Sequence, residues 1–89
     1  MNLVVYDPHA IHDLEKLPKD IQGEVIDKIL FYSSQDNPLL FAKRLKNLDT
    51  GSYRFRIGNY RAIFDILKQK IVVLRIGHRS EIDLLRNFP

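Results

Sequence analysis

The sequence predicts an α+β domain in which a small, antiparallel-rich β-sheet is packed on one face by an N-terminal pair of helices. Two observations support this prediction. Apolar residues recur at helical spacing between residues 8 and 30, and they alternate with basic residues between residues 52 and 76. Chains in which helices come first and strands follow are typical of α+β folds. The expected order is strand, helix, helix and three strands, with a short C-terminal helix (β-α-α-β-β-β-α).

Length and composition indicate one domain spanning residues 1–89, because 45% of the residues are hydrophobic and a chain of this size rarely divides. The absence of cysteine excludes a disulfide scaffold and a thiolate zinc site. The N-terminus acquires a charge at Asp7, too early for a signal peptide, and no apolar run reaches membrane-spanning length. We therefore expect a cytoplasmic protein without contact to a membrane.

The N-terminal third predicts a strand over residues 2–6 and two helices. Asp7 and Pro8 are the residues expected at the N-cap and first position of a helix. Pro18 interrupts this helix and can begin the next one. The first helix is expected to bury Ile11, Leu14 and Leu17, and the second a broad face of Ile21, Val25, Ile26, Ile29 and Leu30.

The middle of the chain is expected to hold a loop over residues 33–38, followed by a short third helix. Asn37 and Pro38 would begin that helix, which would carry an apolar stripe of Phe41, Leu45 and Leu48. Asp49-Thr50-Gly51 reads as a turn.

The strongest short-range signal is a hairpin with a two-residue turn at Gly58-Asn59. Pairing outward from this turn places three apolar pairs on one face: Ile57 with Tyr60, Phe55 with Ala62, and Tyr53 with Phe64. On the other face Arg56 stands opposite Arg61, and Arg54 opposite Ile63. A slip of one residue would scramble both faces, so the pattern defines the register.

The next turn is expected to contain three residues, 68–70. Phe64 then faces Leu74, Ala62 faces Ile76, and Arg75 faces Ile63 on the side of the arginines. Arg79 has the same parity as Arg75. A two-residue turn would instead direct Arg75 into the core, which is why the sequence favours the longer turn.

Positive charge is concentrated in residues 52–80, which hold seven lysines and arginines against the single carboxylate of Asp65. Like charges directly opposite each other destabilise a sheet. The pattern therefore indicates a face that binds a multiply charged anion, and arginine favours phosphate because its planar fork binds two oxygens. The alternative is an ordinary solvated face, which would normally mix both signs of charge.

Three histidines remain as candidate functional groups. His78 adjoins Arg79 and has an ordinary pKa suited to proton transfer at neutral pH, although a histidine at a strand end can also be structural. His9 and His12 stand three residues apart, but no pair of carboxylates completes a metal site, so we expect surface histidines. No phosphate-binding loop or other cofactor motif is found, so neither a metal nor a cofactor is expected.

The segment Tyr53-Arg54-Phe55-Arg56-Ile57-Gly58-Asn59-Tyr60-Arg61, together with Ile76-Gly77-His78-Arg79, resembles the RelE/ParE superfamily of toxins from type II toxin–antitoxin systems. The preceding stretch, residues 42–48, fits as well. This resemblance implies a ribosome-dependent, metal-independent endoribonuclease that cuts mRNA and inhibits translation. Its partners would be the ribosome, the mRNA, and an acidic antitoxin encoded in the same operon. The implied catalytic residues are Arg54, Arg56, Arg61, Arg79 and His78, and the implied RNA-binding residues are Lys43, Arg44, Lys46 and Arg75.

One position departs from the family pattern. After Gly77-His78-Arg79 the family often carries a catalytic tyrosine, where this chain has Asp83. A short anionic side chain there disfavours phosphate. Two alternatives therefore stay open: a ParE-like, non-enzymatic inhibitor of DNA gyrase, and a decayed toxin that only binds its antitoxin.

Overall fold

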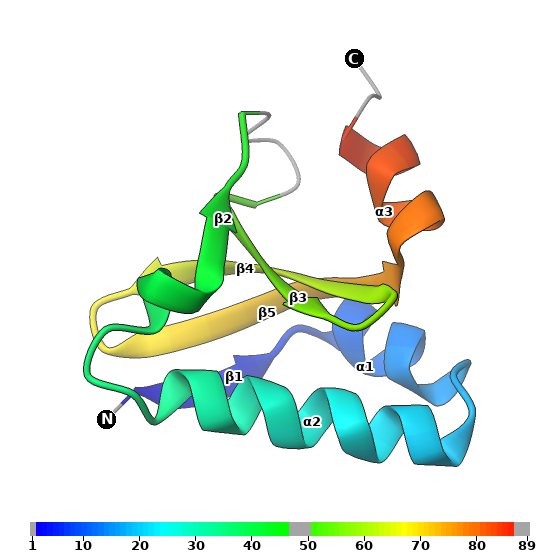
Figure 1. Cartoon of the computed structure of the whole chain (residues 1–89), viewed down its shortest axis with the longest axis horizontal. Coiled ribbons are helices and arrows are strands. Elements are labelled where there is room, and N and C mark those ends of the chain that lie inside the picture. The colour runs from blue at the N-terminus through cyan, green and yellow to red at the C-terminus, as the bar shows by residue number, and fades with distance from the viewer. Residues whose placement is uncertain (1, 47–50, 87–89) are drawn as a thin grey trace.

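The computed structural model describes residues 2–46 and 51–86, and only the backbone for the last four of these. The described chain forms one five-stranded sheet with strand order β1-β5-β4-β3-β2 (Figure 1). In chain order the elements are β1 (Leu3–Tyr6), α1 (Pro8–Glu15), α2 (Lys19–Ser33), the 3₁₀ helix η1 (Pro38–Phe41), β2 (Ala42–Arg44), β3 (Tyr53–Ile57), β4 (Tyr60–Leu67), β5 (Lys70–His78) and α3 (Arg79–Arg86). The strand β1 runs parallel to β5, and the other neighbours are antiparallel.

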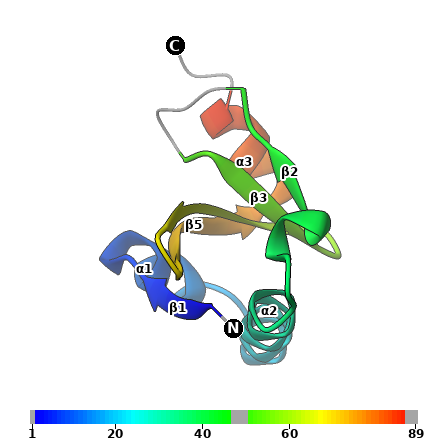
Figure 2. The same ribbon diagram turned by 90° about the vertical axis from the view of Figure 1, so that its left-hand side faces the viewer.

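The sheet separates the N-terminal helices from the C-terminal one. Figure 2 shows α1 and α2 on one side of the strands and α3 on the other. The main core lies between the sheet and the first two helices and includes Val25, Ile29, Phe55 and Phe64, all fully buried. A second, small cluster of Leu45, Ile63 and Ile82 holds α3 to the opposite face. The α+β fold and its helix-covered face are thus confirmed.

The start of α1 is as predicted, and so is the burial of Leu14, with Leu17 partly buried against the core; the prediction fails at Ile11. The Asp7 carboxylate accepts a hydrogen bond from the His9 amide at 2.9 Å, and Pro8 follows the cap. Ala10 and Leu14 are buried, whereas Ile11 is 47% exposed. The prediction for Ile11 was wrong because the helix packs against β5 with the phase of residues 10, 13 and 14, which places Asp13 on the buried side.

The helix α2 begins after Pro18, as predicted, but the broad apolar face is only half buried. Val25 and Ile29 pack into the core, while Ile26 and Leu30 are 39% and 60% exposed. A single helix crossing a sheet needs only a narrow stripe for contact. Ile26, Leu30 and Phe31 therefore stay on the surface, whereas Ile21 is partly buried against the core.

The predicted third helix was wrong beyond its first turn. Asn37 does accept a hydrogen bond from the Leu39 amide, but η1 ends at Phe41 and the chain continues as β2. Pairing with β3 satisfies backbone groups at what would otherwise be an open sheet edge, and this tertiary contact overrides the helical spacing of Phe41 and Leu45. Leu48, Asp49 and Thr50 lie outside the described residues.

The β3–β4 hairpin has the predicted register throughout. All five expected pairs occur, from Tyr53 opposite Phe64 to Ile57 opposite Tyr60. Gly58 has a φ of +58°. Two-residue hairpin turns need such positive φ values, which glycine adopts at little cost.

The β4–β5 hairpin differs from the prediction near its turn. Leu67 pairs with Lys70, so the turn contains only Lys68 and Gln69, and Phe64 faces Val73 instead of Leu74. A register shift between Ile63 and Phe64 then inserts one residue in β5. This bulge restores the predicted pairing of Ile63 with Arg75 and of Ala62 with Ile76. Arg75 therefore takes its predicted place in the sheet although the turn has two residues instead of three.

Candidate functional site

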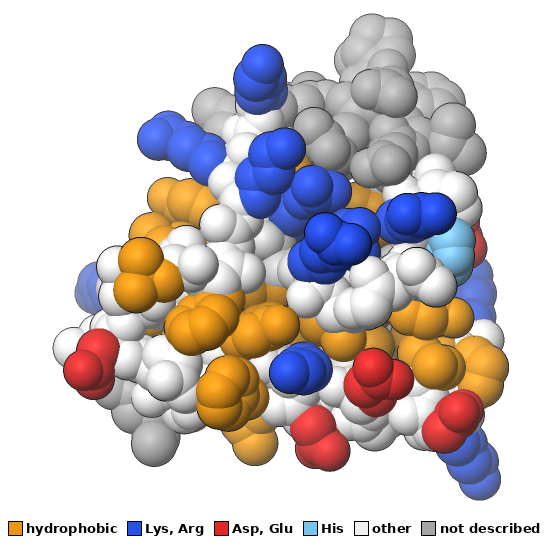
Figure 3. Space-filling view, in the orientation of Figure 1, with side chains coloured by type: hydrophobic (Ala, Val, Ile, Leu, Met, Phe, Trp, Pro, Cys, Tyr) orange, Lys and Arg blue, Asp and Glu red, His pale blue; other side chains and the backbone are white. Residues whose placement is uncertain are grey.

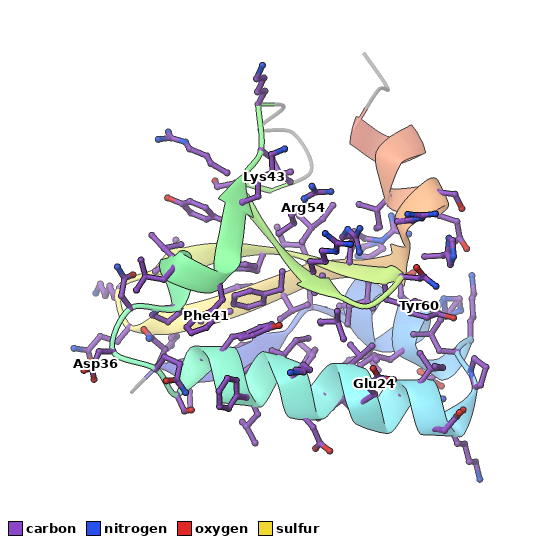
Figure 4. All side chains as sticks on the ribbon, viewed as in Figure 1. Glu24, Asp36, Phe41, Lys43, Arg54 and Tyr60 are labelled. Carbon is purple, nitrogen blue, oxygen red and sulfur yellow. The ribbon has the colours of Figure 1, made fainter. Side chains whose placement is uncertain are left out.

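Basic side chains of β2, β3 and β4 stand opposite each other on the sheet face that does not carry the main core. Lys43 of β2 is the cross-strand partner of Arg54, and Arg56 is the partner of Arg61. Figure 3 shows Lys and Arg side chains gathered over this part of the molecule, and Figure 4 shows Lys43 and Arg54 side by side on β2 and β3. We call these four residues the basic face. Two like-charge pairs at cross-strand positions each cost free energy of folding unless anions compensate them.

Arg61 is the most buried member of the basic face, with 6% of the residue exposed. Its Nη1 donates to the carbonyl oxygens of Gly58 and Tyr60 at 2.9 and 2.8 Å. The guanidinium is therefore held against the β3–β4 turn, which it also helps to close. Arg56, its partner across the hairpin, is exposed to solvent.

The start of α3 is tied to the same turn. The Arg79 amide donates to the carbonyl oxygen of Asn59 at 2.8 Å. Arg79 is exposed and stands beside the β3–β4 turn at the end of the basic face.

His78 is one residue away from the position opposite Arg61. It pairs with Tyr60, whereas Gly77 pairs with Arg61. The His78 and Tyr60 rings meet edge to face, with centroids 5.6 Å apart. The Nδ1 atom of His78 lies 2.9 Å from the Ser80 Oγ and accepts a hydrogen bond from the Ser80 amide at 3.3 Å. Because an amide can only donate, the neutral ring carries its proton on Nε2.

Arg75 has a carboxylate partner that the sequence did not predict. Its Nε and Nη2 donate to the two oxygens of Asp13 on α1 at 2.8 and 3.2 Å. The bonds to Asp13 raise the pKa of the Arg75 guanidinium above its ordinary value, although burial acts in the opposite direction. Arg75 faces Ile63, as expected, but its guanidinium reaches α1 at the edge of the sheet.

The structure therefore brings together part of the predicted set. Lys43, Arg54, Arg56 and Arg61 share one face, and the contact between Arg79 and Asn59 adds Arg79 at its end. Arg44 pairs with Tyr53 and therefore lies on the opposite face of the sheet from Lys43. Lys46 is exposed just beyond β2.

Asp13 is the functional candidate that sequence reasoning missed. The one signal that points to it is an acid on the buried phase of α1, between Ala10 and Leu14. A buried carboxylate at such a position needs a partner.

The histidines of α1 do not build a metal site in the described ranges. The His9 ring contacts the Asp7 carboxylate at 2.9 Å. Hydrogen bonds from the His9 amide and from its ring lower the pKa of Asp7 below its ordinary value. Within residues 2–46 and 51–86 no group of three or more His, Cys, Asp or Glu side chains is suited to hold a metal ion. In the same ranges no helix is both long and apolar enough to cross a membrane.

A separate apolar surface lies on the C-terminal half of α2 and on η1. Leu30, Phe31 and Leu40 are 60%, 51% and 78% exposed. Hollows of about 550 and 510 Å³ adjoin Phe31, and Asp27 lines both. Figure 3 shows this apolar region directly below the basic one.

Comparison with solved structures defines the class of this fold. The toxin–antitoxin complex RelBE2 from Mycobacterium tuberculosis contains a chain 31% identical to this one, with a TM-score of 0.77 over 88% of this chain and 98% of that chain. The RelB–RelE complex from Methanococcus jannaschii matches at 24% identity and a TM-score of 0.66, over 96% and 99% of the two chains. The isolated E. coli RelE toxin matches at 13% identity and a TM-score of 0.68, over 99% and 100%. These proteins are toxins of the RelE type.

The family itself is shown by a sequence model that matches residues 4–83 and describes the ParE toxin of the type II toxin–antitoxin system, parDE. The chain belongs to this family of toxins, within the RelE/ParE superfamily. A search of curated protein sequences finds no significant match.

Proposed function

We propose that this toxin is a ribosome-dependent endoribonuclease that cuts mRNA without a metal ion. The observation that carries the proposal is the two cross-strand pairs of cations on the basic face, Lys43 with Arg54 and Arg56 with Arg61. Four cationic side chains gathered on one face of the sheet, three of them arginines, suit a ligand that carries several phosphates. RNA supplies a series of phosphates, together with the 2′-hydroxyl that this reaction needs.

In the proposed reaction the 2′-oxygen of one nucleotide forms a bond to the adjacent phosphorus, and the bond from phosphorus to the 5′-oxygen of the next nucleotide breaks. The proton of the 2′-hydroxyl passes to solvent. The 5′-oxygen takes up a proton as it leaves. Negative charge grows on the phosphate oxygens in the transition state, and fixed cations stabilise it.

Arginines supply this stabilisation in the proposal. Arg61 is held by the Gly58 and Tyr60 carbonyls, so little reorganisation is needed when charge develops. Arg54, Arg56 and Arg79 bind the scissile phosphate or its neighbours, and Lys43 and Lys46 bind the strand further along. We assign Arg75 a structural role because Asp13 already binds its guanidinium.

His78 is the proposed proton donor to the leaving oxygen. Its neutral form carries a proton on Nε2 because Nδ1 accepts from the Ser80 amide, so Nε2 is not available as a base. The imidazolium carries protons on both ring nitrogens, so the bond from the Ser80 amide is given up and the Nδ1 proton can bond to the Ser80 Oγ, 2.9 Å away. In this form the ring can donate its Nε2 proton to the leaving oxygen.

The partner that silences the toxin is proposed to be an antitoxin with an acidic contacting segment. Solved relatives include complexes of toxin with antitoxin. An acidic segment would neutralise the opposed cations of the basic face.

A ParE-like inhibitor of gyrase is the second candidate function. The match to the ParE toxin family favours it, and so does Asp83 in place of the tyrosine of RelE-like nucleases. Induction in cells followed by mapping of mRNA 5′ ends and of gyrase–DNA breaks separates the two. Cuts at fixed codon positions support the nuclease, and DNA breaks with intact mRNA support the gyrase inhibitor. Unchanged growth without either signal would leave only antitoxin binding.

A further inference from the structure

Among the described residues, no strand lies beside the end of β5 on its β1 side. The parallel pairing of β1 with β5 runs to Tyr6 opposite Val73, and the Asp7 amide then donates to the Val73 carbonyl at 2.9 Å. After this point the chain turns away into α1. The outer edge of β5 from Leu74 onward therefore needs another partner for its backbone groups.

Asp13 of α1 supplies that partner. Its Oδ2 accepts the hydrogen bond of the Ile76 amide at 2.9 Å, as a carbonyl of the missing strand would. The same carboxylate accepts two bonds from Arg75, and the Asp13 side chain is only 10% exposed. One buried carboxylate thus fixes both the backbone and a side chain at the end of β5.

The residues that follow Ile76 belong to the proposed site. On the β4 side Gly77 pairs with Arg61, His78 pairs with Tyr60, and the Arg79 amide bonds to Asn59. On the β1 side of β5, the described hydrogen bond that comes last in sequence before His78 is the one that the Ile76 amide donates to Asp13. Asp13 thus forms a junction between α1 and β5, and the negative charge of Glu81 on α3 adds to the raised pKa of Arg75.

We propose that Asp13 is a positioning residue of the site: by holding the Ile76 amide and the Arg75 guanidinium it fixes the end of β5, with His78 and Arg79, next to the β3–β4 turn that holds Arg61. This inference rests on the proposed function for the roles of His78 and Arg79, but not for the geometry. Misplacement of reacting groups by about 1 Å can cost as much as 10²-fold in rate. A residue remote from the phosphate can therefore control the reaction through the end of β5.

The first test compares Asp13→Asn with Asp7→Ala in the full chain. Both change an aspartate at α1. The Asp7 side chain caps the helix, and the bond from the Asp7 amide to Val73 of β5 is a backbone bond that the substitution keeps. We expect Asp13→Asn to speed amide hydrogen exchange at Ile76, His78 and Arg79 by about tenfold or more, because a buried donor loses a charged acceptor. In Asp7→Ala, the exchange of these amides should stay as slow as in the wild type once any change in global stability is taken into account. Equal effects of the two variants at these amides would overturn the proposal.

The second test uses cleavage of mRNA on purified ribosomes. Asp13→Asn should lower the single-turnover cleavage rate by about 10²-fold at saturating toxin, while Asp7→Ala leaves it near that of the wild type. Asp13→Glu, which keeps the charge, should restore part of the rate. If the wild type does not cut mRNA, the proposed nuclease fails, whereas the exchange experiment still decides the positioning role.

A third variant keeps the proposal testable if Asp13→Asn does not fold. Arg75→Gln removes the ion pair but keeps the bond between Asp13 and the Ile76 amide. We expect intermediate exchange rates at His78 and Arg79 and an intermediate cleavage rate. Wild-type values for both in this variant, together with wild-type values in Asp13→Asn, would contradict a positioning role for the junction.

Discussion

Arg56 and Arg61 are cross-strand partners in the β3–β4 hairpin, but they differ in their surroundings: Arg56 is exposed, whereas Arg61 is 6% exposed and bonded to two carbonyls of its own turn. The two hydrogen bonds hold the buried Arg61 guanidinium in place. Arg56 lies opposite Arg61 and is exposed to solvent. Removing the exposed member therefore relieves the repulsion without opening the hairpin.

We accordingly expect Arg56→Ser to raise the stability of the free toxin. The gain should be about 0.2–1 kcal/mol, the range for one cross-strand pair. Urea unfolding of the variant and the wild type at low ionic strength measures it. High salt should shrink the difference, because screening weakens the repulsion. A clear loss of stability would mean that the Arg56 side chain has a structural partner.

Antitoxin binding should weaken as the salt concentration rises. The basic face holds four cationic side chains, and an acidic partner segment bound there is held by charge that salt screens. Titration calorimetry of the purified pair at increasing NaCl concentration checks this. Affinity that does not depend on salt would point instead to an apolar contact, for which Leu30, Phe31 and Leu40 provide the exposed surface.

The cap of α1 should be sensitive to acid. Hydrogen bonds from His9 lower the pKa of Asp7 below its ordinary value of 3.8, so the folded state favours the charged carboxylate. This contribution to stability is present above the ordinary pKa and is lost as the pH falls through the lowered one. Asp7→Asn keeps a capping side chain that does not titrate. Between pH 5 and pH 2 the wild type should therefore lose more stability than this variant, and parallel curves would contradict the assignment.

The His78 ring should carry its neutral-form proton on Nε2. The Ser80 amide donates to Nδ1, and the Ser80 hydroxyl lies 2.9 Å from the same atom. The ¹⁵N and ¹³Cδ2 chemical shifts of the ring distinguish the two tautomers. Ser80→Ala, which removes the hydroxyl, should increase the share of the Nδ1-protonated form. A ring protonated on Nδ1 in the wild type would contradict the geometry.

Sequence reasoning predicted that Arg54, Arg56 and Arg61 share one face because local rules define this hairpin, whereas it did not place Lys43 there. The turn at Gly58-Asn59 and the alternation of Tyr53, Phe55 and Ile57 with arginines leave one register that buries the apolar side chains. The same alternation placed Arg75 opposite Ile63, although for a reason that was wrong: a bulge in β5 compensates for the shorter turn.

The parts that could not be predicted depend on contacts between distant segments. Residues 42–44 became a strand because the edge of β3 offers backbone partners, and no local pattern announces this. The bond from Asp13 to Arg75 joins residues 62 apart in sequence. A single sequence does not reveal such a pair, because neither residue type nor spacing defines it.

The most direct measurement of the central claim is the single-turnover cleavage of mRNA on purified ribosomes by variants of the basic face. Arg56→Ala and Arg79→Ala should each lower the rate by about 10²–10³-fold, the cost of removing one group that stabilises transition-state charge. Lys70→Ala, which removes an exposed cation at the other end of β5, serves as the control and should cut at the wild-type rate. Cleavage that is equal in all three variants, or absent in the wild type, would contradict the proposal that the basic face acts on RNA.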